Sequence, residues 1–169
     1  MTLLAILAAA AVTTTPTSAD VATKQASMGV EFMLPGGTPA PTVGLTYFIN
    51  DNMALRTDFG LNAQLSPSGV PVLFSLGVGV RLYQFKRDSV AVFLTPSFTL
   101  ARVAGVPDAT ISLIFAGGAG VQYFFTNRFS VGGILGLAFT IGNLGGPTGS
   151  SATINLSTGT TGLFAGYYF

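Results

Sequence analysis

The stretch that decides the fold is residues 153–169, which read TINLSTGTTGLFAGYYF. Counted back from its end, every second residue shares one side of an extended strand, namely Phe169, Tyr167, Ala165 and Leu163. A chain that ends on an aromatic residue with no polar tail is expected to place this strand inside a structure. A strand leaves N–H and C=O groups unpaired along its edge, and in a membrane only a closed sheet removes such an edge. The stretch therefore predicts the closing strand of a transmembrane β-barrel, paired with the first strand.

The composition of the 169-residue chain favours a membrane protein built from strands. Hydrophobic residues make up 49% and charged residues only 8%, whereas roughly 25% of an average soluble domain is charged. Beyond the N-terminus, no uninterrupted apolar stretch reaches the roughly 20 residues that a spanning helix needs. The 22 glycines and the many short apolar runs indicate β-structure. The net charge of +1 argues against nucleic acid as a partner.

The first residues are typical of a secretory signal peptide. A short apolar core precedes the small residues Thr-Ser-Ala at 17–19, which a signal peptidase accepts. No Lys or Arg precedes the apolar core, so an upstream start and a true N-terminal helix both stay open as alternatives. The predicted organisation is a signal peptide at 1–19, a periplasmic N-terminal lead at 20–26 and a transmembrane barrel at 27–169.

Short polar turns recur at regular intervals along the remaining chain, at 50–52, 86–89 and 126–128. Breaks rich in Gly and Pro lie between them, at 35–41, 64–71, 104–108 and 142–151. One interval is the length of an up-and-down hairpin, so the pattern predicts an all-β, closed antiparallel eight-stranded transmembrane barrel with up-and-down topology. The expected strands are 27–34, 42–49, 53–63, 71–83, 90–102, 110–124, 129–141 and 153–169.

Alternation inside these strands predicts which residues face the lumen. Where it is clearest, at 53–63, 71–83 and 129–141, large apolar residues alternate with small or polar ones. The large face would meet lipid and the small face the lumen. The charged residues well inside strands all lie on the small face, and they are Glu31, Arg56, Asp58 and Arg81. Because a charge facing lipid at mid-depth costs about 2–4 kcal/mol, a membrane demands this placement.

Two residues depart from the pattern. Pro96 lies in the middle of its strand, where it removes a ladder donor, so we expect a bulge or a local bend there. Arg102 lies on the apolar face near the end of the same strand, where its long side chain can reach the membrane interface.

The signal-like N-terminus, the alternating strands, the short polar turns and the terminal Tyr167-Tyr168-Phe169 together carry a resemblance. The chain resembles the small eight-stranded outer-membrane β-barrel proteins of Gram-negative bacteria, with a porin-like outer-membrane β-barrel domain, over nearly its whole mature length. The resemblance implies an outer-membrane location with both termini facing the periplasm, and membrane lipid and the barrel-insertion machinery as partners. In that family, a terminal Phe preceded by alternating apolar residues is the insertion signal, which here maps onto Leu163, Tyr167 and Phe169.

Alternatives to the barrel stay open from the sequence alone. The segments 111–125 and 129–144 are rich in small residues, as the interfaces of membrane helices often are. They are brief for spanning helices and are separated by a very short turn. A soluble β-sandwich is the other alternative.

An enzyme is not expected. The chain has no histidine, so a triad that relies on His as its base cannot be assembled. It has no cysteine either, which excludes metal sites built on imidazole or thiolate. A mechanism that uses only Glu31 and Asp58 is conceivable, although arginines are expected beside both. Runs such as GVG at 77–79 lack the strand–loop–helix context of a nucleotide site. We expect no catalytic residues, no cofactor and no metal.

The charged residues of the lumen carry the sharper hypothesis. Arg56 is expected opposite position 78 or 79, so Arg81 would be a near neighbour on the same face. Glu31 is expected at a similar height, and an eight-stranded barrel is just wide enough for side chains to fill. With Asp58 included, the two negative charges balance the two positive charges. The four residues would form either a buried ion network that plugs the barrel and fixes its register or a polar constriction that gates a narrow pore.

The other inward positions leave two interpretations open. Many are small, namely Gly44, Gly60, Gly77, Gly79, Ala116, Gly118, Gly120, Gly132, Gly136, Gly162 and Gly166. Glycine relieves crowding in a small barrel, but it also leaves room for water or a small ligand. Large residues are expected inside as well, namely Phe48, Phe93, Ile114, Phe124 and Ile134. The first functional hypothesis is a monomeric, porin-like barrel for passive passage of small solutes. The alternative is a plugged structural or surface-interaction barrel without transport.

Overall fold

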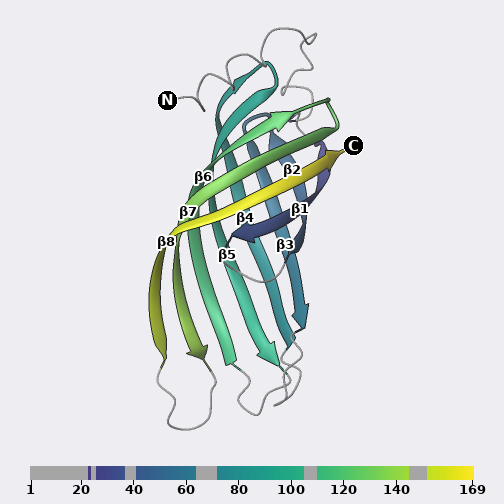
Figure 1. Ribbon diagram of the computed structural model, residues 1–169. Coiled ribbons are helices and arrows are strands. Elements are labelled where there is room, and N and C mark those ends of the chain that lie inside the picture. Colours follow the sequence, from purple (N-terminus) through teal and green to yellow (C-terminus); the bar gives the residue numbers. More distant parts are fainter. Residues whose placement is uncertain (1–22, 24–25, 37–40, 64–71, 105–109, 145–151) are drawn as a thin grey trace, which may run out of the picture.

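The structure is a computed structural model that describes residues 23, 26–36, 41–63, 72–104, 110–144 and 152–169. Its strands in chain order are β1 (Met28–Gly36), β2 (Thr42–Asn50), β3 (Met53–Ala63), β4 (Val72–Arg87), β5 (Val90–Ala104), β6 (Thr110–Phe124), β7 (Phe129–Leu144) and β8 (Thr153–Tyr168). Each strand pairs antiparallel with the next, and β8 pairs with β1 to close the barrel (Figure 1). This confirms the predicted all-β, eight-stranded, up-and-down barrel. The expected signal peptide lies outside the described residues.

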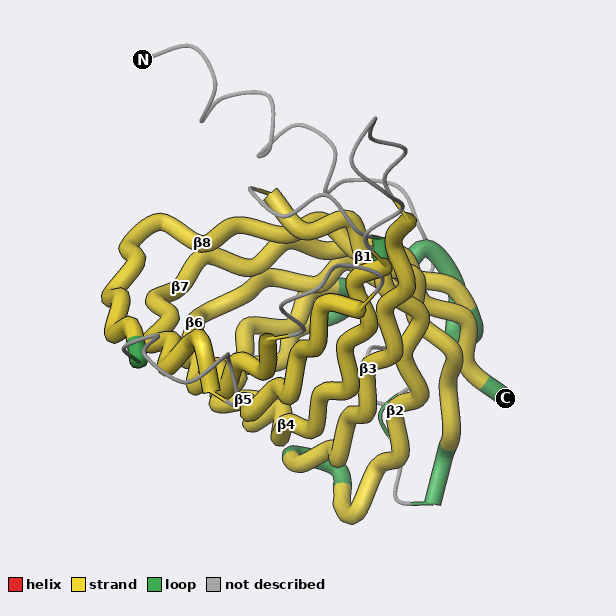
Figure 2. Tube along the Cα trace, turned by 90° about the horizontal axis from the view of Figure 1, so that it is seen from below, coloured by secondary structure: helices red, strands yellow, loops and turns green. Residues whose placement is uncertain are grey.

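The barrel has two unlike ends. At the turn end, uppermost in Figure 1, short turns connect β2 to β3, β4 to β5 and β6 to β7, and β8 finishes there. The opposite ends of these strands form the other end of the barrel, which we call the loop end. Figure 2 shows the strands wrapped around a single interior. No helix long and apolar enough to span a membrane occurs among the residues that the structure describes.

The strand bounds lie within three residues of the sequence prediction except at one turn. The polar run 86–89 was expected as a turn, but β4 continues to Arg87 and leaves only Asp88 and Ser89 between strands. Asp88 adopts a left-handed backbone conformation with φ of 51°, which an Asp tolerates better than most residues. A two-residue connection matches the twist of neighbouring antiparallel strands, so Lys86 and Arg87 stay paired with β5.

The exterior is the apolar face, as the alternation predicted. Its large side chains are exposed, with Leu76 at 53% and Leu137 at 54%. Exposed aromatic residues gather near the turn end, namely Tyr47, Phe85, Phe125, Phe129, Tyr167 and Phe169. Others lie nearer the loop end, namely Phe32, Phe59, Phe74, Phe115 and Phe139. Two aromatic belts around an apolar band are the exterior of a transmembrane barrel.

Pro96 does not cause the expected bulge. Gly79 pairs with Ser97 and Leu82 pairs with Leu94, so β4 and β5 keep one register on both sides of the proline. The ladder instead omits two pairs, Val80 with Pro96 and Arg81 with Thr95. A bulge is absent because a proline removes one donor without adding a residue to the strand, and the alternative that was expected, a local bend, stays a prediction.

A bulge lies in β8, where the sequence prediction had unbroken alternation. Gly136 pairs with Thr160 but Leu137 pairs with Thr158, so β8 has one extra residue. The extra residue reverses which side chains face outward. Leu163 beyond the bulge and Leu156 before it are therefore both on the exterior, at 67% and 69% exposed.

Candidate functional site: the barrel lumen

The lumen near the turn end is filled by aromatic rings. The buried rings are Phe48, Tyr83, Phe93, Phe124, Phe164 and Tyr168, all exposed by 5% or less. Neighbouring rings lie in contact, with centroids 5.7 Å apart for Phe48 and Tyr83 and 5.9 Å apart for Phe124 and Tyr168. Small residues such as Ala54 make room for the rings. We call these six residues the aromatic layer.

An ion network lies directly against the aromatic layer. The Arg81 guanidinium donates to both carboxylate oxygens of Glu31, with Nη1–Oε1 at 2.7 Å and Nη2–Oε2 at 2.9 Å. Both side chains are 0% exposed. The Arg81 guanidinium carbon also lies 4.4 Å from the ring centroid of Phe93 and 4.6 Å from that of Phe164. Two charge-assisted hydrogen bonds and two aromatic faces therefore hold one guanidinium.

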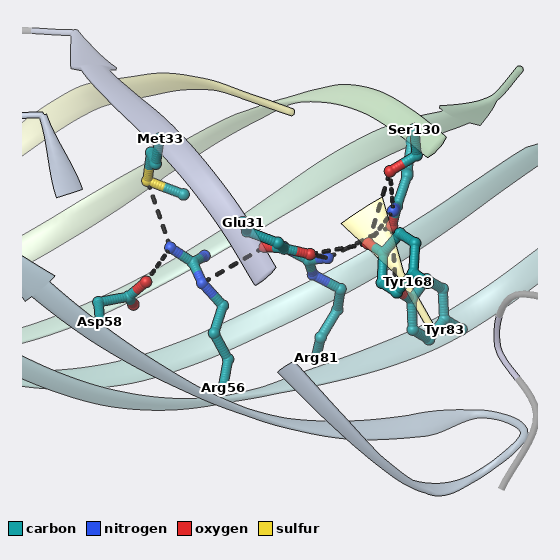
Figure 3. Close-up of polar contacts among 9 residues, drawn as sticks. Glu31, Met33, Arg56, Asp58, Arg81, Tyr83, Ser130 and Tyr168 are labelled. Atoms are coloured by element: carbon teal, nitrogen blue, oxygen red, sulfur yellow. Dashed lines mark hydrogen bonds and ion pairs between the residues drawn. The ribbon is translucent and has the colours of Figure 1, made fainter. Parts of the chain in front are cut away.

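Arg56 connects Glu31 to the second carboxylate. Its Nε lies 3.6 Å from Glu31 Oε2, and its Nη2 donates to Asp58 Oδ1 at 2.5 Å. The same Nη2 lies 3.4 Å from the sulfur of Met33. Figure 3 shows the resulting row from Asp58 through Arg56 and Glu31 to Arg81. Strands β1, β3 and β4 thus bring all four charged residues singled out in the sequence into one network. Their role as a constriction stays a prediction.

Uncharged residues complete the network, and the sequence analysis missed them. The Gln122 side-chain amide donates to Ser130 Oγ at 2.7 Å and to Tyr168 Oη at 2.6 Å. Its carbonyl oxygen accepts from Tyr83 Oη at 3.0 Å. The Tyr168 hydroxyl in turn donates to Glu31 Oε1 at 2.8 Å. Strand parity was a signal for Gln122, because it lies two residues from Phe124 and therefore shares the inward face of β6.

A cavity of about 280 Å³ occupies the lumen between the ion network and the loop end. Arg56 and Asp58 form its floor, and its walls reach Thr42 and Leu73 at the loop-end starts of β2 and β4. The expected inward residues Ile114 and Ile134 line this cavity, whereas Phe48, Phe93 and Phe124 are buried in the aromatic layer. The lumen is therefore solid near the turn end and hollow near the loop end.

Known proteins give a match at the level of structure. No family model and no curated protein matches the sequence. The N-terminal β-barrel domain of Pseudomonas aeruginosa OprF superposes with a TM-score of 0.59 at 16% identity, over 86% of this chain and 98% of that one. The chain has the fold of a small outer-membrane β-barrel. Ail, the attachment invasion locus protein of Yersinia pestis, matches over 85% of this chain and 94% of its own, with a TM-score of 0.40 and 14% identity.

The fold agrees with the one that the resemblance implies, and the apolar exterior is that of a membrane-spanning barrel. The outer-membrane location stays a prediction. The residues proposed as the insertion signal lie on that exterior, with Leu163, Tyr167 and Phe169 exposed by 67%, 50% and 67%. They belong to the strand that closes the barrel, where Tyr167 pairs with Val30 and Leu163 with Leu34. Their recognition by the insertion machinery stays a prediction.

Proposed function

We propose that this outer-membrane barrel is a structural or surface-interaction protein whose lumen is closed to solutes in the resting state. The observation that carries the proposal is the Glu31–Arg81 ion pair, whose side chains are 0% exposed in the middle of the lumen. On its turn-end side, the aromatic layer continues the filling. A solute that crossed the barrel would have to displace both.

Breaking this plug is costly. Separating Arg81 from Glu31 leaves a carboxylate without its main partner in a site from which water is excluded, at a cost of about 3–5 kcal/mol for a buried pair. The guanidinium would also leave the faces of Phe93 and Phe164. Because an open state is higher in free energy by this amount, it is populated less than about 1% of the time.

Porin-like passage of small solutes is the second candidate function. One observation favours it: the cavity already extends from the loop end to Arg56 and Asp58. A solute there has only the ion network and the aromatic layer to cross. Passage would then be slow and would depend on Arg81, since that guanidinium holds the network and the rings together.

Conductance across planar bilayers tests the two candidates. The parent protein, with its fold checked by circular dichroism, is expected to leave the bilayer as silent as a protein-free control. Arg81→Ala is expected to produce brief current steps because it loosens the plug. Arg102→Ala, which removes an exposed arginine from the exterior of β5, is the matched control and is expected to stay silent. Steady current through the parent that Arg81→Ala alters and Arg102→Ala does not would overturn the closed barrel in favour of passage.

A further inference from the structure

The cavity in the loop-end half of the lumen has two chemically different walls. Side-chain hydroxyls come from β2, β4 and β5, namely Thr42, Ser75, Thr95, Ser97 and Thr99. Apolar side chains come mainly from β1, β6 and β7, namely Met33, Ile114, Ala116 and Ile134, while β4 and β5 add Leu73 and Ala101 to the hydroxyl wall. Its volume of about 280 Å³ is close to the lower end of small-molecule pockets, which run from about 300 to 1,000 Å³. The walls suit a small molecule with one polar side and one apolar side.

Backbone contacts keep part of this space open. A Cβ built on Gly136 would lie 2.5 Å from the backbone oxygen of Gly117, and one on Gly118 would lie 2.8 Å from that of Leu135. Backbone cannot move aside as the end of a side chain can. These two lining positions are therefore restricted to glycine, and the wall beside Ile134 stays hollow.

The floor of the cavity offers a carboxylate to a ligand. Glu31 and Arg81 are 0% exposed and Arg56 is 7% exposed, but the Asp58 side chain is 21% exposed. Asp58 is thus the most exposed charged side chain of the network, and because its Oδ1 accepts from Arg56, a ligand would meet its Oδ2. An exposed carboxylate oxygen calls for a donor.

We propose that this cavity binds a small amphipathic amine. Its ammonium group would donate to Asp58 Oδ2, and its short alkyl body would pack on Ile114 and Ile134. An amphipathic anion fits less well, because Arg56 is already shared between two carboxylates and the anion would meet Asp58 first. The proposal does not depend on whether the lumen conducts, because the cavity ends at the network.

Isoleucine methyl NMR of the full chain in detergent micelles tests the proposal. The probe is n-butylammonium, compared with n-butanol and butyrate, which match it in chain length. Ile114 and Ile134 line the cavity, whereas Ile49 and Ile154 are exposed on the exterior and report partition into the micelle. We expect saturable shifts at the cavity methyls with n-butylammonium, affinity about tenfold weaker with n-butanol, and no saturation with butyrate.

Two variants separate binding in the cavity from binding elsewhere. Ala116→Leu fills the cavity and is expected to abolish the shifts at Ile134. Ala119→Leu makes the same change three residues further along β6 on the exposed face, and is expected to preserve them. Asp58→Asn is expected to weaken n-butylammonium about tenfold and leave n-butanol unchanged.

The proposal is overturned by either of two results. One is equal affinity for n-butylammonium and n-butanol, since the Asp58 carboxylate would then not distinguish the amine from the alcohol. The other is a set of shifts that survives Ala116→Leu or appears equally at Ile49 and Ile154, since the amine would then lie outside the cavity. Because Ala116 makes no contact in the ion network, this second test holds even if Asp58→Asn fails to fold.

Discussion

Glu31 on β1 and Arg81 on β4 join opposite parts of the barrel wall through two hydrogen bonds of 2.7 and 2.9 Å. Two strands separate β1 from β4 in the sheet, so this contact crosses the lumen and does not follow the wall. The interior is thereby braced by a charged pair where a soluble barrel would use apolar side chains alone.

Arg81→Ala is expected to destabilise the barrel by about 3–5 kcal/mol, because it leaves the Glu31 carboxylate buried with weaker partners. Urea unfolding in detergent, followed by circular dichroism, measures the loss. Arg102→Ala, on the exposed face, is expected to change stability by less than about 0.5 kcal/mol. Arg56→Ala is expected to lie between them, since Glu31 keeps Arg81.

A double substitution separates the contribution of charge from the contribution of packing in the Glu31–Arg81 pair. Replacing both partners in Glu31→Met with Arg81→Met removes the buried charges together, and is expected to recover most of the stability that Arg81→Ala loses. If the double variant is no more stable than Arg81→Ala, the loss does not come from an uncompensated charge.

Gly120→Ala is expected to cost about 1–3 kcal/mol by overpacking. A Cβ at Gly120 would lie 2.3 Å from the ring of Phe93 and 2.8 Å from the backbone oxygen of Gly133. Gly117→Ala on the same strand is the control, because a Cβ there meets nothing within 4 Å. It is expected to stay within about 0.5 kcal/mol of the parent. Equal losses for the two variants would contradict this account of the aromatic layer.

A designed disulfide checks the closure of the barrel. Phe32 pairs directly with Ala165, and the chain has no cysteine of its own. Cysteines introduced as Phe32→Cys and Ala165→Cys are expected to cross-link on mild oxidation, seen as a mobility change on unreduced gels. Phe32→Cys with Phe169→Cys is the control, since position 169 lies four residues, about 13 Å, further along. Cross-linking of the control pair alone would place β8 in another register.

Phe169→Ala is expected to reduce the amount of barrel that reaches the outer membrane, without much change in the stability of barrel already folded. The reason is the insertion signal that the family resemblance implies at Leu163, Tyr167 and Phe169. Phe125→Ala is the control, because Phe125 is a similarly exposed aromatic near the turn end, at 54% against 67% for Phe169. Membrane fractionation measures the yield, and equal yields for both variants would remove the special role of position 169.

The fold could be predicted well because a membrane requires apolar residues on the lipid side of each strand. The alternation within one strand therefore shows which of its sides faces lipid. In β3, Leu55 and Phe59 face lipid while Arg56 faces the lumen, and one strand alone shows this alternation. Arg56 was expected opposite position 78 or 79 and pairs with Gly79. A slip of one residue would move the apolar side chains of β3 or β4 to the wrong face, so clear alternation narrowed the register of this hairpin.

The features that the sequence did not predict depend on contacts between side chains or backbones of different strands. Nothing near Gln122 indicates that Tyr83, Ser130 and Tyr168 converge on its amide. The solid aromatic layer likewise needs the radius of the closed barrel, which no single strand reveals. The bulge in β8 arises from its pairing with Gly136 and Leu137 of β7, and the presence of a glycine does not by itself predict it.

The seam between β1 and β8 has a consequence for how the molecule assembles. The other ladders join neighbouring segments of the chain, but the hydrogen bond from Tyr168 to Glu31 spans 137 residues. Contacts of such long range form late, because the loop-closure entropy must be paid first. Arg81 and Arg56 can therefore pair with Glu31 before β8 arrives, whereas the hydrogen bond from Tyr168 forms only when the seam zips shut and so marks the last step of assembly.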